Sequence, residues 1–351
     1  MSSQTPIPET FAGSDLFPTR FENQVEKFKD KIAIKEQEKS LTYGELNREA
    51  NQIAHQTLSF NPEHNLPIVI LTSHGSQTIK SMIGVLKAGR PYVVVDPSYP
   101  LHRIRTILED SLSQLIITDN ENLELAKLVL KSTQNSSSLE IINIDQIDQA
   151  TSTANPGMTI SPDDYAFLIY TSGTTGTPKG VINNHRNLLS KITRYTSSNK
   201  VTERDNILLI ASLSFSASTT DVFGPLVNGA TIFPFQIKNH GFTQLAKWMM
   251  EEKITMYHSV PTTFRHFAKS LTETDQFPHL RSIRLGGEAI YKIDVDLYKK
   301  HFPDECILRI GLAGTESSGI CHNIIDKNTQ INSEIVPVGR PSYESEVFIL
   351  D

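Results

Sequence analysis

The chain of 351 residues has only two cysteines, Cys306 and Cys321, and its 11 histidines are scattered. A disulfide framework or a zinc site needs Cys and His residues at short regular spacings, so neither is expected, and the two thiols are interpreted as core residues. No apolar run approaches the roughly 20 residues that span a bilayer. The polar start lacks a signal-peptide core, so we expect a flexible tail over residues 1–15 in a cytoplasmic protein.

Excess positive charge is missing as well. Lysine and arginine together number 33 against 39 aspartate and glutamate residues, which gives a net charge of −6. This balance argues against a nucleic-acid partner, and the missing apolar runs argue against a membrane partner. The length is sufficient for one large domain or two ordinary ones.

The chain does contain a repeated alternation of short apolar runs and helical patterns. Runs such as 68–71 and 92–95 are rich in β-branched residues and are separated by amphipathic segments. This alternation predicts an α/β fold of mostly parallel sheets flanked by helices. Thr42 and Glu45 form a capping-box pattern at the start of one helix. The polar segment 149–162 is a candidate boundary between two halves, about 16–150 and 163–335.

Four predicted strands are each followed by a polar loop. The four loops are 171–180, the segment after Ile210, 286–288 and 314–316. Ligands bind outside the carboxyl ends of parallel strands, so we expect these loops to converge on one site. Glycines that expose backbone N–H groups, hydroxyls and one lysine make the first loop suitable for phosphate. Its lysine lies between proline and glycine, so the Walker pattern fails. By composition alone, a flexible surface loop is the alternative.

Glu316 is the best candidate for a metal ligand, because a carboxylate opposite phosphate oxygens suits Mg²⁺. A solvated or helix-capping glutamate is the alternative. His185, His258 and His266 lie near motifs, but an isolated histidine is more often structural than catalytic. The sequence shows no paired carboxylates and no Ser-His-Asp arrangement.

Several segments together resemble the adenylate-forming superfamily, which comprises acyl-CoA synthetases, luciferases and the adenylation domains of nonribosomal peptide synthetases. Residues 170–181, YTSGTTGTPKGV, are similar to its AMP-binding signature. Residues 41–46 and 337–341 resemble further motifs, and the form of 86–96 favours peptide synthetase domains. The segment 215–218 stands where the family has Phe-Asp-x-Ser.

The likeness extends from about residue 16 to 351 and includes 311–316, where the family has Tyr-Gly-Pro-Thr-Glu. It implies the large N-terminal subdomain of that fold, with the start of a β-barrel at 336–351. Family members continue with the rest of the barrel, a ribose-binding aspartate and a small C-terminal subdomain that supplies a lysine. None of these is found in this sequence, so we expect a partial adenylation core with exposed apolar surface where the barrel packs.

The resemblance implies that a carboxylate attacks the α-phosphorus of Mg·ATP, giving an acyl-adenylate and pyrophosphate. The acyl group then passes to the phosphopantetheine thiol of a carrier domain. The positions implied for the ATP phosphates are Thr171, Ser172, Gly173, Thr174, Thr175, Gly176 and Lys179. The catalytic positions implied are Thr315, Glu316 and Lys179, with Mg²⁺ on Glu316. Those implied for adenine are Gly287, Glu288, Gly311, Leu312, Ala313 and Gly314.

Motif alignment places the acid substrate against Phe215, Ser216, Ala217, Thr220, His258, Arg284, Gly286, Gly311, Gly319 and Ile320. In amino-acid-activating members, the Asp of Phe-Asp-x-Ser pairs with the substrate's α-ammonium group, and Ser216 replaces it here. A hydroxyl cannot replace a desolvated charge pair, so we predict an acid without a free α-amino group, of the aryl, keto, hydroxy, β-amino or guanidino type.

Other interpretations stay open. Asp221 can take over the pairing role, or the acid site can be degenerate. Arg284 can meet an anionic group of the substrate or point outward. The chain as a whole can be a catalytically incompetent nucleotide- or acid-binding module, or a relative of acyl-CoA synthetases and fatty-acyl-AMP ligases.

Overall fold

The computed structural model describes residues 16–60, 66–133, 139–172, 178–342 and 346–349. The chain divides into two compact units, one made of residues up to 201 together with 212–229, the other of 202–211 and 230–351. Within the described part, no helix is long and apolar enough to cross a bilayer.

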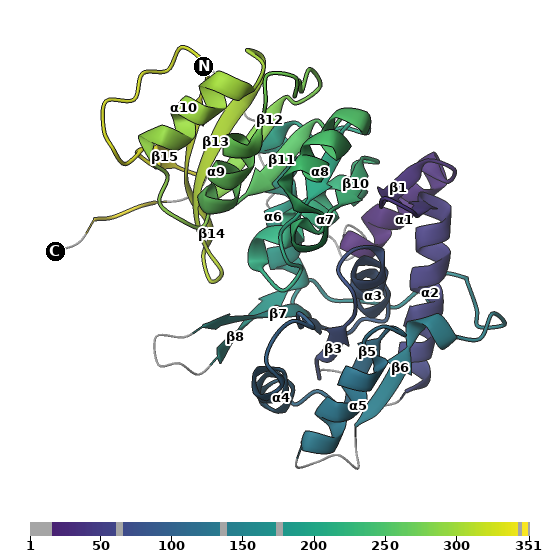
Figure 1. Cartoon of the computed structure of the whole chain (residues 1–351). Helices are drawn as coiled ribbons and strands as arrows, with labels where there is room; N and C mark the ends of the chain where they lie inside the picture. Colours follow the sequence, from purple (N-terminus) through teal and green to yellow (C-terminus); the bar gives the residue numbers. More distant parts are fainter. Residues whose placement is uncertain (1–15, 61–65, 134–138, 173–177, 343–345, 350–351) are drawn as a thin grey trace. The chain divides into compact units, whose positions relative to one another are not determined.

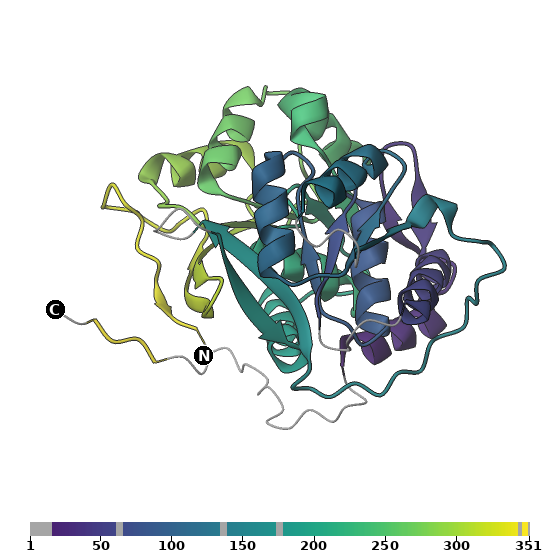
Figure 2. The same ribbon diagram turned by 90° about the horizontal axis from the view of Figure 1, so that it is seen from below.

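The first unit is built on a sheet of order β6-β5-β3-β4-β7-β8. Its members are β3 (Ile68–Leu71), β4 (Tyr92–Val94), β5 (Leu115–Thr118), β6 (Glu140–Asn143), β7 (Tyr165–Ser172) and β8 (Pro178–Asn184). The strands run parallel except β8, which forms an antiparallel hairpin with β7 and is drawn in teal in Figure 2. The predicted parallel α/β sheet is therefore confirmed for this unit.

Helices cover this sheet because their apolar stripes match its β-branched faces. Side chains of α4 (Leu101–Asp110) and α5 (Leu123–Ser132) join those of β3, β4, β5 and β7 in one buried cluster. The remaining helices are α1 (Phe17–Phe28), α2 (Tyr43–Ser59), α3 (Ser76–Lys87), η3 (Ile144–Gln146), α6 (His185–Asn199) and α7 (Ser216–Leu226), and β1 (Ile32–Lys35) pairs with β2 (Ser40–Thr42). The predicted capping box begins α2, where the Glu45 N–H donates to Thr42 Oγ1 at 3.2 Å and the Thr42 N–H to Glu45 Oε2 at 2.8 Å.

The second unit has the strand order β10-β9-β11-β12-β13-β14-β15. The bounds are β9 (Asn206–Leu209), β10 (Thr231–Pro234), β11 (Met256–Ser259), β12 (Ser282–Gly286), β13 (Ile307–Gly314), β14 (Ser318–Ile325) and β15 (Arg340–Pro341). Strands β9 to β13 are parallel, and β14 and β15 return antiparallel. The helices α8 (Ile237–Glu251), α9 (Pro261–Ser270) and α10 (Lys292–His301) share one aromatic-rich core with this sheet (Figure 1).

The boundary between the units differs from the predicted one at 149–162. Strand β7 follows that loop but pairs in parallel with β4, through Tyr92 with Phe167 and Val93 with Leu168. Long-range strand pairing therefore keeps β7, β8, α6 and α7 in the first unit, so the predicted halves 16–150 and 163–335 are wrong. Of the segment 336–351, where the start of a β-barrel is expected, residues 340–341 form β15 and residues 346–349 carry no strand.

Candidate functional site

The predicted phosphate loop lies between β7 and β8. Residues 173–177 fall outside the described residues, but the hairpin around them is defined, with Thr171 opposite Lys179 and Tyr170 opposite Gly180. Lys179 is exposed, so its ammonium group is accessible to an anion. The hairpin thus presents a hydroxyl and a cation at the end of a buried strand, as the sequence predicted.

Tyr170 anchors the entrance to this loop. Its hydroxyl donates to Asp110 Oδ2 at 2.6 Å, and its ring is 8% exposed. Burial, and secondly the neighbouring Asp110, raise the pKa of this phenol well above its usual value, so it stays protonated and donates. A Cβ at Gly180 would lie 3.1 Å from the ring, which explains why the residue opposite Tyr170 is a glycine.

The segment expected to contact the acid begins α7, with Phe215 as its N-cap residue. Phe215 is 55% exposed, and Ser216 and Thr220 are partly exposed. Asp221 is only 1% exposed and lies one helical turn after Ala217. Ser216 is therefore presented at the start of the helix, whereas the carboxylate that could replace the missing aspartate is in the interior.

A set of hydrogen bonds holds the residues just before α7, and sequence reasoning missed it. Ser212 Oγ donates to Asp96 Oδ2 at 2.8 Å and lies 3.0 Å from Ser214 Oγ. The Tyr99 hydroxyl lies 2.9 Å from Ser214 Oγ. The motif at 86–96 contains Asp96, but nothing in the sequence indicates which segment its carboxylate would meet.

In the second unit, four predicted acid-site positions share one face of the sheet. His258 is in register with Arg284, and Gly286 with Gly311. Side chains alternate along a strand, so these positions lie opposite the face that carries the buried core residues Ile283, Leu285, Leu308 and Ile310. The parallel register therefore brings His258, Arg284 and the two glycines together.

The two glycines differ in how much room they have. A Cβ at Gly286 would lie 3.0 Å from the carbonyl oxygen of Gly311, whereas a Cβ at Gly311 would meet nothing within 4 Å. Gly286 is thus required by its neighbouring strand. Gly311 faces open space that a ligand can use.

Arg309 belongs to the same face but was not among the predicted site residues. It is in register with Arg284 and lies two positions before Gly311. Burial, and then Arg281 and Arg284, lower the pKa of its guanidinium. Its Nε is buried and has no hydrogen-bond partner among the described residues. The family motif marks the residues after Arg309, so the resemblance gave no signal for it.

The turn after β12 contains the first predicted adenine residues. Gly287 has φ +85°, a left-handed conformation that favours glycine. The Glu288 carboxylate accepts from the Thr262 N–H at 3.0 Å and from the Thr262 hydroxyl at 2.6 Å. Glu288 therefore satisfies an N–H group in the first turn of α9, a structural role that the motif did not reveal.

The turn between β13 and β14 carries Thr315 and Glu316. Thr315 is partly exposed and Glu316 is exposed. The described residues contain no group of three His, Cys, Asp or Glu side chains that could hold a metal alone. A single accessible carboxylate fits Mg²⁺ only together with nucleotide phosphates and water. Gly319 and Ile320 follow on β14, where both are partly exposed.

The family model of AMP-binding enzymes matches residues 21–351. The chain belongs to the AMP-binding enzyme family. This family consists of acid–AMP ligases, and the chain corresponds to the N-terminal subdomain of its adenylation domains.

Similar curated proteins are peptide synthases. The chain is 30% identical over 333 residues to tyrocidine synthase 1 of Brevibacillus parabrevis, covering 94% of this chain and 29% of that protein. It is 32% identical over 336 residues to tyrocidine synthase 3 of the same organism, covering 94% of this chain and 5% of the relative. The chain therefore spans less than a third of these relatives.

Solved structures share the fold. The nonribosomal peptide synthetase FmoA3 bound to α-methyl-L-serine-AMP has a TM-score of 0.84 at 24% identity, covering 96% of this chain and 37% of that one. The Klebsiella oxytoca NpsA N-terminal subdomain in complex with 3-hydroxybenzoyl-AMSN has a TM-score of 0.79 at 22% identity, covering 93% and 80%. The expected fold class is confirmed by these likenesses.

Other polar groups have structural roles. Cys306 and Cys321 are buried, as predicted, and burial raises the pKa of the Cys306 thiol to about 12. His185 is 1% exposed, and neither ring nitrogen has a hydrogen-bond partner among the described residues. The exposed His266 stacks on Phe242, with ring centroids 6.3 Å apart.

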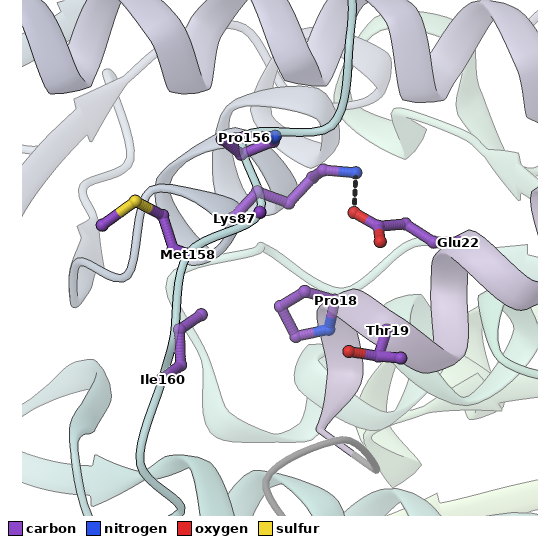
Figure 3. A pocket seen from close by; sticks show the side chains of 8 residues that line it. Pro18, Thr19, Glu22, Lys87, Pro156, Met158 and Ile160 are labelled. Carbon is purple, nitrogen blue, oxygen red and sulfur yellow. Dashed lines mark ion pairs between the residues drawn. The ribbon is translucent and has the colours of Figure 1, made fainter.

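A pocket of about 170 Å³ in the first unit contains none of the predicted site residues (Figure 3). The pocket contains a buried cation, Lys87. Its Nζ lies 2.5 Å from Glu22 Oε1 and donates to Asn47 Oδ1 at 2.7 Å and to Asn155 Oδ1 at 3.0 Å. All three ammonium hydrogens thus have acceptors. Lys87 ties α1, α2 and the loop at 155 to α3, and we interpret it as structural.

Proposed function

We propose that this chain is the core of an enzyme that activates a carboxylic acid with ATP. The observation that carries the proposal is the position of the motif residues. Within each unit, the residues matched to phosphate and adenine binding lie toward the carboxyl ends of β7, β12 and β13 or in the segments that directly follow them. Those matched to acid binding lie at the start of α7 and on β11 to β14. The family match over residues 21–351 supports the same reaction class.

The reaction can be written for these residues. A carboxylate oxygen of the acid attacks the α-phosphorus of ATP, an acyl–O–P bond forms, and the bond to pyrophosphate breaks. Lys179 and the loop hydroxyls neutralise and orient the phosphates, and Thr315 donates to the α-phosphate. Glu316 would hold Mg²⁺, which supplies charge neutralisation at the phosphate oxygens.

The acyl-adenylate is the donor for a second transfer. A thiol attacks its carbonyl carbon, a thioester forms, and AMP leaves with the bonding electron pair. We infer that the acceptor is the phosphopantetheine thiol of a carrier domain, because the curated relatives are peptide synthases. The adenine is proposed to lie against residues 287–288 and 311–314, where three glycines have no side chain to cover the backbone.

We infer that the acid lacks a free α-amino group. Ser216 offers a hydroxyl at the start of α7, where amino-acid-activating relatives are expected to have a carboxylate. An ammonium group placed there would lose its hydration without gaining a countercharge. Arg284 and Arg309 share the face that we assign to the acid, and their charge favours a substrate with a second anionic group.

ATP–pyrophosphate exchange across a panel of aryl, keto, hydroxy, β-amino and α-amino acids tests the proposal. Exchange is expected with an acid that has no α-amino group, and binding of AMPPNP is expected without any acid. Preferred exchange with a standard α-amino acid would refute the substrate class. Binding of AMPPNP without exchange for any acid would favour a nucleotide-binding module instead.

A further inference from the structure

Helix α4 lies between the two functional segments of the first unit. At its start, Tyr99 and Asp96 hold the residues before α7, and the Arg103 guanidinium lies 4.1 Å from the centre of the Tyr99 ring. At its end, Asp110 accepts the hydrogen bond of Tyr170, at the entrance to the phosphate loop. Helix α4 and the turn at 96–100 that precedes it therefore contact both segments through side chains.

The connection to the acid segment is specific in its geometry. The two carboxylate oxygens of Asp96 accept hydrogen bonds from different segments. Oδ1 accepts from the Ser98 N–H at 2.9 Å and from the Ser98 hydroxyl at 2.7 Å. Oδ2 accepts from the Ser212 hydroxyl. The local turn at Ser98 thus orients the carboxylate, and its second oxygen is left for the distant segment. Charge-assisted hydrogen bonds of this type are stronger than neutral ones.

The segment 212–214, which Asp96 and Tyr99 contact, continues directly into the residues proposed to touch the acid. The Phe215 N–H donates to the Ser212 carbonyl at 3.1 Å, and the Ser218 N–H and hydroxyl both donate to the Phe215 carbonyl, at 3.2 and 2.6 Å. The side chain of Leu213, between the two held serines, is 4% exposed. A shift of Ser212 would therefore move Phe215 and Ser216 as well.

We propose that α4, together with the turn at 96–100 before it, is a spacer that sets the positions of the acid-binding and phosphate-binding segments. Asp96 and Tyr99 in the turn are positioning residues for the acid, and Asp110 at the end of the helix is one for ATP. This inference rests on the proposed function for what the segments bind. A helix of ten residues is rigid and about 15 Å long, so its two ends cannot move independently. In-line attack tolerates little misplacement, since about 1 Å can cost on the order of a hundredfold in rate.

Two groups of variants test the contacts at the two ends of α4 separately. S212A, Y99F and D96N should each raise the KM for the acid about tenfold and change the KM for ATP less than about twofold. Y170F should do the reverse. T106A is the matched control, because it removes a hydroxyl of α4 that donates to the His102 carbonyl within the same helix. The D96N/S212A double variant should resemble either single variant, since both remove one interaction.

Hydrogen–deuterium exchange of the amides in 212–218 provides a readout that does not depend on activity. We expect faster exchange there in S212A, D96N and Y99F than in the wild type or T106A, and unchanged exchange in Y170F. Equal exchange in all variants would overturn the proposal, and so would equal changes of both KM values in S212A. Absence of pyrophosphate exchange in the wild type would refute the proposed function, while the amide exchange would still decide the role of α4.

Discussion

The residues proposed to bind ligands are arranged differently within each of the two units. In the first unit, side chains distant in sequence are joined, as Ser212 is to Asp96, 116 residues away. In the second unit, the paired strands β12 and β13 carry two glycines in register, Gly286 and Gly311, that have no side chain to fill the space above the sheet. The first part should therefore be sensitive to the loss of a hydroxyl, and the second to the gain of a methyl group.

Glu316 lies in the second unit but is proposed to act through its carboxylate, unlike the two glycines. Its substitution should cause the largest loss of activity. We expect E316Q to lower pyrophosphate exchange by about two orders of magnitude, because a neutral amide cannot neutralise or anchor charge at the phosphates. The free energy of unfolding should stay unchanged, since the side chain is exposed. Exchange at the wild-type rate would remove Glu316 from the mechanism.

His185, at the start of α6, should make the stability of the first unit depend on pH. Burial lowers the pKa of His185 from 6.5 to about 4, against an opposing effect of Asp164. The unfolded chain therefore binds a proton that the folded chain excludes, so stability is full above pH 6.5 and falls as the pH drops toward 4. The expected loss between pH 7.5 and 5 is about 2 kcal/mol.

Urea unfolding of the wild type and H185Q at pH 7.5 and at pH 5 measures this loss of unfolding free energy. The variant should lose less stability than the wild type on acidification. H266Q, which removes an exposed ring, is the control and should keep the wild-type difference. The same acid-induced loss in H185Q and wild type would assign it to other groups.

Arg309 tests whether charge on the second unit's sheet selects the acid. R309Q should weaken exchange with acids that carry a second anionic group by about tenfold relative to matched monocarboxylic acids, because a charged hydrogen bond is lost. R309K keeps the charge and should show a smaller change. An equal loss for both acid types would make Arg309 structural.

The pair G286A and G311A should give the smallest effect on stability and activity. It tests directly whether the two glycines of β12 and β13 face different surroundings. G286A should lower the free energy of unfolding by about 1 kcal/mol, because its Cβ would crowd the Gly311 carbonyl. G311A has open space, so its stability should match the wild type while its KM for the acid rises. Equal stability losses would mean that Gly311 does not face a cavity.

Local patterns predicted much of this structure. The alternation of runs gave the parallel sheets, and the capping box of Thr42 and Glu45 was found as expected. The boundary at 149–162 was wrong because the pairing of β7 with β4 is a long-range event that no local composition reports. The Asp96–Ser212 hydrogen bond was missed for the same reason. Arg309 was missed because it lies outside the motif that carried the resemblance.

We have proposed that Ser216 makes this a site for acids without an α-ammonium group. The sharpest test is pyrophosphate exchange by the wild type and S216D with one acid and its α-amino counterpart. We expect the wild type to prefer the acid without the amino group, and S216D to shift the ratio toward the amino acid by at least about tenfold. A wild type that already prefers the amino acid, with D221N abolishing that preference, would contradict the claim and assign the pairing to Asp221.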